Sequence, residues 1–157
     1  MNLIKLQNIT KNYQIDKYNH QQVLKNISIT LPTTGLVAIV GKSGCGKTTL
    51  LNIIGLLDKP TSGKLYFNNV DTTKWNKRKI SNFHNHEVGI IFQQYNLIED
   101  QSVIYNVALP MMVKGEKKNK SFEDAKTLLE GMKIKEELWN KKVSKLSGGE
   151  KQRVAIL

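Results

Sequence analysis

The sequence is short of cysteine, arginine and long apolar runs, and each shortage excludes a class of protein. Cys45 is the single cysteine, which excludes an internal disulfide and a cysteine metal cluster. Arginine occurs only at Arg78 and Arg153, although the net charge is +11. Nucleic-acid surfaces favour clustered arginine, whereas the lysines here are spread along the chain, so we expect no nucleic-acid partner. No apolar run approaches the ~18 residues of a membrane-spanning helix.

What the chain does contain is a glycine-rich stretch between two apolar segments. Residues 36–40 predict a buried strand, and residues 49–57 predict a helix too apolar to be exposed. The stretch between them fits the pattern G-x-x-x-x-G-K-[ST]: Gly41, Lys42, Ser43, Gly44, Cys45, Gly46, Lys47 and Thr48. Backbone N–H groups at a helix start point at an anion, so we predict a phosphate-binding loop. Lys47 would contact the β- and γ-phosphates of a nucleotide, and Thr48 would bind Mg²⁺. Thr49, the next residue, is a further candidate for nucleotide binding.

The rest of the chain predicts strands first and helices later. Near-alternating apolar residues predict half-buried strands over 3–9 and 23–31, with Tyr13, Tyr18 and His20 in a polar loop between them. The remaining predictions are strands at 64–67 and 88–92, helices at 73–83 and 103–112, a solvated connector at 114–120, and a helix from a capping-box-like start at Ser121 to Met132.

A second glycine motif lies near the end of the sequence. Residues 146–155 read Leu-Ser-Gly-Gly-Glu-Lys-Gln-Arg-Val-Ala. A serine hydroxyl and glycine N–H groups at a helix start form a second anion site, so Ser147, Gly148 and Gly149 are candidate phosphate contacts.

The two motifs together resemble the ABC-type ATPases, and the resemblance covers essentially the whole chain. It implies a P-loop α/β fold with an N-terminal antiparallel β subdomain and a helical subdomain, and it implies ATP and Mg²⁺ as cofactors. By this resemblance Gln93, rather than Gln94, contacts Mg²⁺ and the γ-phosphate, and Tyr13 stacks on adenine. Residues 56–63 and 93–97 are similar to the branch of lipoprotein-releasing, macrolide-exporting and antimicrobial-peptide transporter ATPases.

The resemblance also implies an organisation and partners. We expect one domain over 1–157, divided into 1–93 (β subdomain and phosphate loop), 94–146 (helical subdomain) and 147–157 (start of the signature helix). The expected partners are a second copy bound head-to-tail and an integral membrane permease. The expected location is cytoplasmic, peripheral on the inner face of the cell membrane.

One expected part of the family's site is missing from residues 1–157. No apolar run is followed by Asp-Glu, the pair that in this family orients Mg²⁺ and activates water. We therefore expect an N-terminal fragment with an incomplete core sheet, whose exposed edges favour association. Such a fragment is expected to bind Mg·ATP weakly and to hydrolyse it negligibly, because orienting the nucleophile contributes orders of magnitude in rate. Tyr105 and Val143 depart from the branch's usual residues, so the substrate stays open.

Other functions fit the sequence less well. A non-transport ABC ATPase acting on ribosomes or DNA stays open, although no heptad run of a DNA-repair type occurs. A GTPase would need Asn-Lys-x-Asp, which the sequence lacks, and a nucleoside kinase would need lid arginines that two arginines do not supply.

Overall fold

The computed structural model describes residues 2–157 and divides the chain into two compact units. The first unit runs to Asn82, and the second runs from Phe83 to Leu157. The expected subdomain division at residues 93 and 146 stays a prediction. Within the described residues, no helix has the length and apolar character needed to cross a bilayer.

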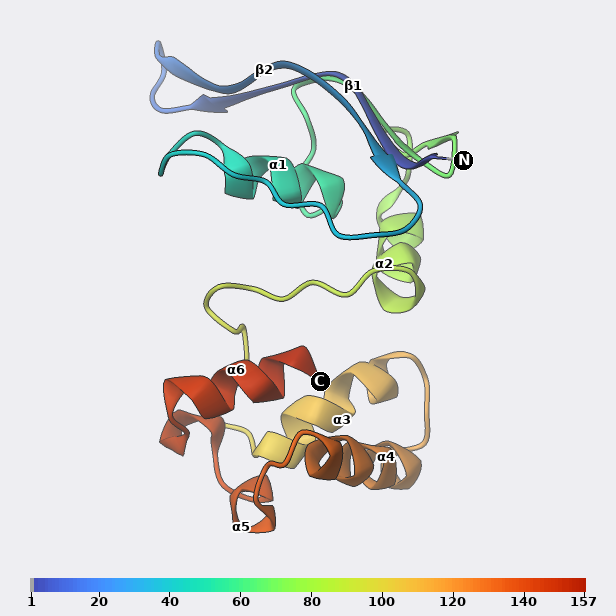
Figure 1. The fold of residues 1–157 in the computed structure, drawn as a ribbon, viewed down its shortest axis with the longest axis vertical. Helices are drawn as coiled ribbons and strands as arrows, with labels where there is room; N and C mark the ends of the chain where they lie inside the picture. The colour runs from blue at the N-terminus through green and yellow to red at the C-terminus, as the bar shows by residue number, and fades with distance from the viewer. Residues whose placement is uncertain (1) are drawn as a thin grey trace. The chain divides into compact units, whose positions relative to one another are not determined.

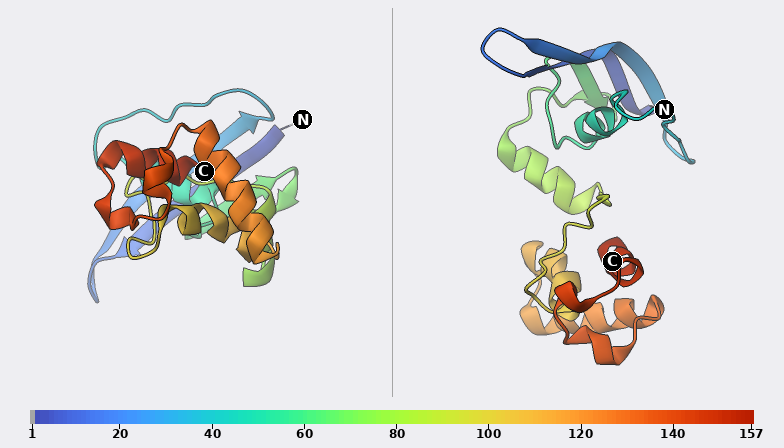
Figure 2. Two further views of the ribbon diagram at one scale, coloured as in Figure 1. Left: turned by 90° about the horizontal axis from the view of Figure 1, so that it is seen from below. Right: turned by 90° about the vertical axis from the view of Figure 1, so that its left-hand side faces the viewer.

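The first unit is a four-stranded antiparallel sheet with one helix packed on it (Figure 1). The strands are β1 (Asn2–Gln14), β2 (His20–Pro32), β3 (Ser62–Phe67) and β4 (Val70–Asp71), in the order β2-β1-β3-β4. Helix α1 (Lys47–Ile54) covers one face of this sheet, which the right-hand view of Figure 2 also shows. The buried side chains between sheet and helix are Leu6, Ile9, Leu24, Leu50, Ile53 and Leu65. Burying these apolar faces against one another is what holds α1 and its preceding loop to the sheet.

The β1–β2 hairpin is longer than the sequence predicts. Tyr13 and His20 lie inside the paired strands, where Tyr13 pairs with Gln21 and His20 with Gln14, so the prediction of a loop at these two residues is wrong. The pairing register shifts near Asn8 and Asn26, whose φ angles of 53° and 50° are left-handed. Asparagine tolerates left-handed φ angles better than most non-glycine residues, so it accommodates these irregularities in the pairing. The strands therefore continue through residues whose apolar and polar side chains do not alternate regularly.

The second unit is helical. Its elements are α3 (Val103–Val113), α4 (Lys118–Gly131), α5 (Glu136–Trp139), a 3₁₀ turn at Val143–Lys145 and α6 (Gly148–Ile156). Helix α2 (Lys77–His86) crosses the boundary between the units and lies later than the predicted 73–83. The core of the second unit consists of Val103, Ile104, Val107, Ala108, Ala125, Leu129, Ile134, Trp139, Val143, Leu146 and Val154. This core fixes the start of α6, because Leu146 and Val154 flank it.

The predicted capping box at Ser121 is wrong. Helix α4 begins at Lys118, with Lys117 as its N-cap, so the last part of the predicted charged connector is helical. Ser121 is fully buried inside the helix, where its hydroxyl donates to the Lys117 carbonyl at 3.2 Å. A serine that bonds the carbonyl four residues earlier continues the helix instead of starting it.

Two predicted buried strands, 36–40 and 88–92, are also wrong for the described residues. Neither run pairs with a strand there, and the side chains of Leu36, Val40 and Ile91 are 97%, 85% and 62% exposed. An apolar run predicts strand propensity, but a strand forms only beside a partner strand. Helix α1 likewise ends at Ile54, before the predicted 57, and Leu51 is 55% exposed rather than buried.

Candidate functional site

The glycine-rich loop leads directly into α1 and leaves the start of that helix open. Gly46 is the N-cap residue, with φ 96° and ψ 9°, and no side chain accepts a hydrogen bond from the first turn. A side chain at Gly46 would come within 3.0 Å of Leu24 and 3.1 Å of Val23 on β2. The first N–H groups of a helix have no partner within the helix and carry a partial positive charge. This helix start is therefore able to bind an anion such as a phosphate.

The Lys47 ammonium lies across the same loop. Its Nζ atom donates to the carbonyl oxygens of Gly41 at 3.0 Å and Lys42 at 2.8 Å, and it lies 3.9 Å from the Cys45 sulfur. These contacts curl the loop around a cation at its centre. Residues 41–45 and Thr48 are exposed, whereas Gly46 and Lys47 are partly buried. The donor set of backbone N–H groups, one ammonium and one hydroxyl fits a Mg²⁺-bound polyphosphate.

Tyr13 lies on β1 and is held by two charged side chains. Its hydroxyl donates to Asp58 Oδ2 at 2.9 Å, and the Lys11 Nζ lies 4.8 Å from its ring centroid. Lys11 also bonds Asp58 Oδ1 at 2.7 Å. Partial burial tends to raise the pKa of Asp58, but hydrogen bonds from Lys11, Tyr13 and the Lys59 N–H outweigh it and hold that pKa below its ordinary value. Asp58 is therefore an ionised anchor at neutral pH.

Ser147 and the two glycines after it begin α6, as predicted. Ser147 is the N-cap residue of a complete capping box with Glu150. Its hydroxyl donates to Glu150 Oε2 at 2.7 Å and accepts from the Glu150 N–H at 3.4 Å, while its own N–H donates to Glu150 Oε2 at 2.8 Å. These bonds from Ser147 hold the pKa of Glu150 below its ordinary value of 4.5. Ser147, Gly148 and Gly149 are exposed, but the serine proton is already donated to a carboxylate.

Gln93 lies at the start of a turn in the second unit. The turn closes through a 3.1 Å bond from the Tyr95 N–H to the Phe92 carbonyl, and Tyr95 and Asn96 have positive φ angles of 61° and 51°. The Gln93 side chain is exposed.

The structure brings the candidate residues together in two groups. The loop residues 41–49 and Tyr13 belong to the first unit, and Gln93 and Ser147–Gly149 belong to the second. Sequence reasoning missed Lys11, Asp58 and Glu150, which hold the predicted residues in place. The spacing S-x-x-E from Ser147 to Glu150 is a capping-box signal that could have found Glu150. Lys11 and Asp58 are 47 residues apart, so no local pattern could pair them.

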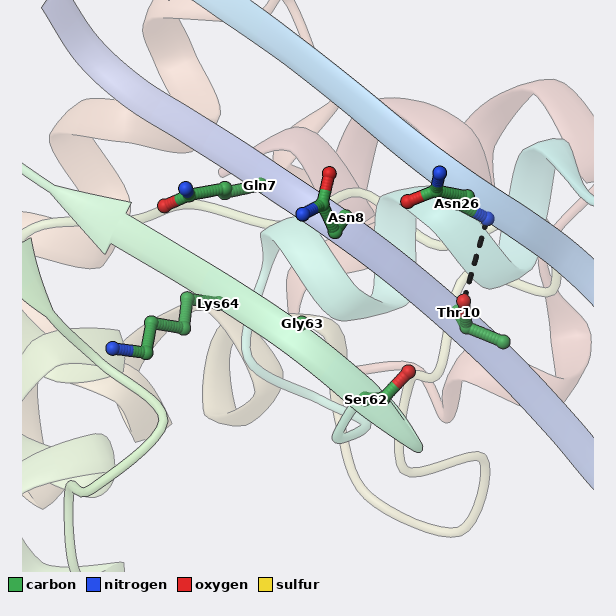
Figure 3. A pocket seen from close by; sticks show the side chains of 7 residues that line it. All are labelled: Gln7, Asn8, Thr10, Asn26, Ser62, Gly63 and Lys64. Atoms are coloured by element: carbon green, nitrogen blue, oxygen red, sulfur yellow. Dashed lines mark hydrogen bonds between the residues drawn. The ribbon is translucent and has the colours of Figure 1, made fainter.

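Two hollows, one in each unit, are lined by other residues. A polar hollow on the sheet has a volume of about 490 Å³. Figure 3 shows the residues that line it, which are Gln7, Asn8, Thr10, Asn26, Ser62, Gly63 and Lys64. The irregular register forms it, since the Asn26 N–H donates to the Thr10 hydroxyl at 3.3 Å there. The second unit has an apolar groove of about 760 Å³ between residues 84–91, the end of α3 and the end of α6. Neither hollow is lined by a predicted nucleotide-binding residue.

The sequence matches one family of known proteins. The model of the ABC transporter family matches residues 24–157. The lipoprotein-releasing system ATP-binding protein LolD of Syntrophus aciditrophicus is 36% identical over 154 residues, which cover 98% of this chain and 68% of that protein. The macrolide export ATP-binding/permease protein MacB of Campylobacter jejuni is 40% identical over 154 residues, 98% of this chain and 23% of MacB.

A solved structure agrees with the sequence matches. The dimeric ATP-binding cassette MJ0796, from Methanocaldococcus jannaschii and bound to ADP and Pi, superposes with a TM-score of 0.88 at 36% identity. The match covers 98% of this chain and 67% of that one, so the present chain spans about two thirds of the cassette. The expected α/β fold of the ABC ATPases is therefore confirmed. The chain belongs to the ABC transporter family and represents the ATP-binding domain of that family.

Proposed function

We propose that this chain binds Mg·ATP and supplies the energy of an ABC transporter of the lipoprotein-releasing or macrolide-exporting kind. The observation that carries the proposal is the open start of α1, where Gly46 caps the helix without a side chain and the Lys47 ammonium lies across the loop. Thr48 and Gln93 are the proposed Mg²⁺ contacts, and Tyr13 is the proposed contact of the adenine ring. Residues 41–49 hold the phosphates.

The proposed partners are a second copy of the chain and a membrane permease. Ser147, Gly148 and Gly149 would contact the phosphates held by the second copy in a head-to-tail pair. The dimeric state of the MJ0796 cassette with ADP and Pi, and the permease named together with the ATP-binding part of MacB, support these partners. The corresponding location is the inner face of the cell membrane.

We further propose that residues 1–157 alone bind Mg·ATP weakly and hydrolyse it negligibly. The phosphate loop supplies positioning and charge, but the sequence contains no apolar run followed by Asp-Glu to orient the attacking water. A steady ATPase rate of the purified chain that Lys47→Ala abolishes would contradict this proposal.

Titration calorimetry with Mg·ATP tests the binding proposal. Lys47→Ala removes the ammonium that would contact the phosphates, and a charge-assisted contact of this kind corresponds to about 10- to 100-fold in affinity. Lys64→Ala is the matched control, because Lys64 is an exposed lysine of the same unit, outside the loop. Equal affinities of wild type and Lys47→Ala, or equal losses in the two variants, would contradict the proposed site.

A further inference from the structure

Tyr13 is fixed in place by contacts that reach far along the chain. Its hydroxyl is bonded to Asp58, 45 residues away, at 2.9 Å, and Lys11 bonds the other oxygen of the same carboxylate at 2.7 Å. Lys11 makes a further bond to the Lys59 carbonyl at 2.7 Å. One carboxylate therefore holds both the tyrosine and the lysine beside it.

The burial of Lys11 indicates that its contacts with Asp58 and Tyr13 are specific. Its side chain is only 11% exposed, compared with 56% for Lys64 in the same unit. A buried ammonium requires charged or polar partners, and Lys11 has both a carboxylate and a carbonyl. Its Nζ also lies 4.8 Å from the Tyr13 ring centroid, within the range of a cation–π contact. A cation on one face of a ring leaves the opposite face for stacking, and Tyr13 is 38% exposed.

Asp58 is itself tied to the helix that follows the phosphate loop. Its N–H donates to the Asn52 carbonyl of α1 at 3.2 Å, and the Leu57 N–H donates to the same oxygen at 2.8 Å. The next segment is fastened to β1, since the Thr61 N–H donates to the Thr10 carbonyl at 2.8 Å and the Asn12 N–H donates to the Thr61 hydroxyl at 3.0 Å. The end of β1 and the end of α1 are thus joined into one rigid corner.

We propose that Lys11 and Asp58 are positioning residues for Tyr13: Asp58 anchors the hydroxyl, Lys11 covers one ring face, and the other face stacks on the nucleobase. This inference rests on the proposed nucleotide function and adds to it the residues that orient the base contact. Helix α1 connects this corner to the phosphate loop at its other end. The distance between the base contact and the phosphate contacts is therefore set within one unit, before the nucleotide arrives.

The physical consequence is a smaller entropy loss on binding. A tyrosine that is free to rotate must be immobilised when a base stacks on it, whereas the anchored ring is already ordered. The effect of losing the anchor should therefore appear in the affinity for ligands that have a base and not in the affinity for bare polyphosphate. A general loosening of the unit would weaken both ligands alike.

The test compares Mg·ATP with Mg·tripolyphosphate by titration calorimetry. We expect Tyr13→Phe and Asp58→Asn each to weaken Mg·ATP about 3- to 10-fold and to leave Mg·tripolyphosphate unchanged. Tyr13→Phe should cost less in the Asp58→Asn background than in wild type, because both changes weaken the bond between these two side chains. Tyr66→Phe and Asp71→Asn are matched controls on β3 and β4 of the same unit, and both should bind like wild type.

The outcomes separate this inference from the proposed function. If Tyr13→Phe and Asp58→Asn bind Mg·ATP like wild type, or lose affinity for both ligands equally, the inference is wrong. The proposed nucleotide site is tested separately, by the loss of Mg·ATP affinity in Lys47→Ala. A wild-type chain that binds neither ligand would overturn both. If Asp58→Asn folds poorly, Tyr13→Phe alone tests the inference. This variant removes only the hydroxyl that bonds Asp58 and keeps the aromatic ring.

Discussion

The starts of α1 and α6 are built from similar residues but differ in how their backbone groups are satisfied. At α1, Gly46 is the N-cap, no side chain caps the helix, and the first turn has no acidic residue. At α6, Ser147 forms a capping box with Glu150, whose carboxylate lies in the first turn. Both motifs predict an anion site from sequence. Only the first leaves its helix start open, because the second already has a negative charge of its own at the position where an anion is stabilised.

This difference predicts different roles for the two motifs. The loop before α1 can accept a phosphate without first breaking a bond to a carboxylate. Ser147, in contrast, donates its only hydroxyl proton to Glu150 at 2.7 Å, so it must release that bond before it can donate to a phosphate. The α1 site is thus the one expected to bind nucleotide first, and the α6 site the one that joins later.

Adding one methyl group at each helix start gives the largest expected contrast. Gly46→Ala places a side chain at φ 96° and within 3.0 Å of Leu24, so we expect the first unit to lose roughly 1–3 kcal/mol of stability. Gly149→Ala adds a methyl group into open space on α6, so we expect the second unit to gain about 0.5–1 kcal/mol. Hydrogen exchange followed separately in peptides of α1 and α6 measures both changes in one experiment.

The sign of the two effects is the decisive result. Gly46→Ala should also weaken Mg·ATP binding, since it disturbs the helix start that we propose as the phosphate site. A Gly46→Ala chain as protected as wild type in α1, with unchanged nucleotide affinity, would mean that the left-handed N-cap is not required.

Removing the cap of α6 should have an intermediate effect. Ser147→Ala deletes the hydroxyl that accepts from the Glu150 N–H, and loss of an N-cap side chain costs about 1 kcal/mol. Trp139 reports the second unit, because it is 6% exposed and its indole N–H donates to the Ile134 carbonyl at 2.9 Å. Urea unfolding followed by Trp139 fluorescence in a Trp75→Phe background measures the loss.

Ser43→Ala is the matched control at the start of α1. Ser43 lies in the first unit, which Trp139 does not report, so hydrogen exchange in the α1 peptide measures its effect. Ser43 lies in the exposed phosphate loop, where no serine caps α1, so its replacement should change stability by less than about 0.5 kcal/mol. Equal effects of the two serine variants would remove the contrast between the helix starts.

The elements that the sequence predicted well are those specified by local pattern. The helix that follows Lys47, the strand at 64–67 with its turn at 68–69, and the helix after Ser147 all occur, because glycine, turn asparagines and a capping serine act within a few residues. The runs 36–40 and 88–92 were mispredicted as paired strands, since pairing depends on a partner strand that no local pattern reveals. The prediction that a helix starts at Ser121 was wrong for a related reason: Ser121 is buried in the core, inside a helix that begins earlier.

The candidate site divides in the same way. The phosphate loop and the α6 start were predictable as motifs, and each leads into a helix in the structure, although the strand expected at 36–40 does not form. The contacts that orient Tyr13 were not predictable, because Lys11 and Asp58 come together only through the packing of β1 against the segment after α1. Long-range pairs of this kind carry no sequence spacing of their own.

The smallest expected effect concerns acid, and it tests the carboxylate in the α6 cap directly. Hydrogen bonds from the Ser147 hydroxyl and N–H lower the pKa of Glu150 below 4.5, with smaller contributions from the charges of Arg153 and Lys135. A carboxyl group whose pKa is lower in the folded state stabilises the fold above its unfolded pKa, and this stabilisation is lost as the pH falls through the folded value. Glu150→Gln cannot titrate, so its stability should not have this component.

The measurement is the difference in urea midpoint between wild type and Glu150→Gln, followed by Trp139 from neutral pH down through pH 4.5 and below. Wild type should be the more stable chain at neutral pH, and the difference should shrink as Glu150 becomes protonated. All other acidic groups titrate in both chains, so they cancel in the difference. In a Ser147→Ala background the pH dependence should be reduced, because the bonds that lower the pKa of Glu150 are fewer. A difference that stays constant with pH would show that Glu150 is not held by the cap, and the start of α6 would then be as open to an anion as the start of α1.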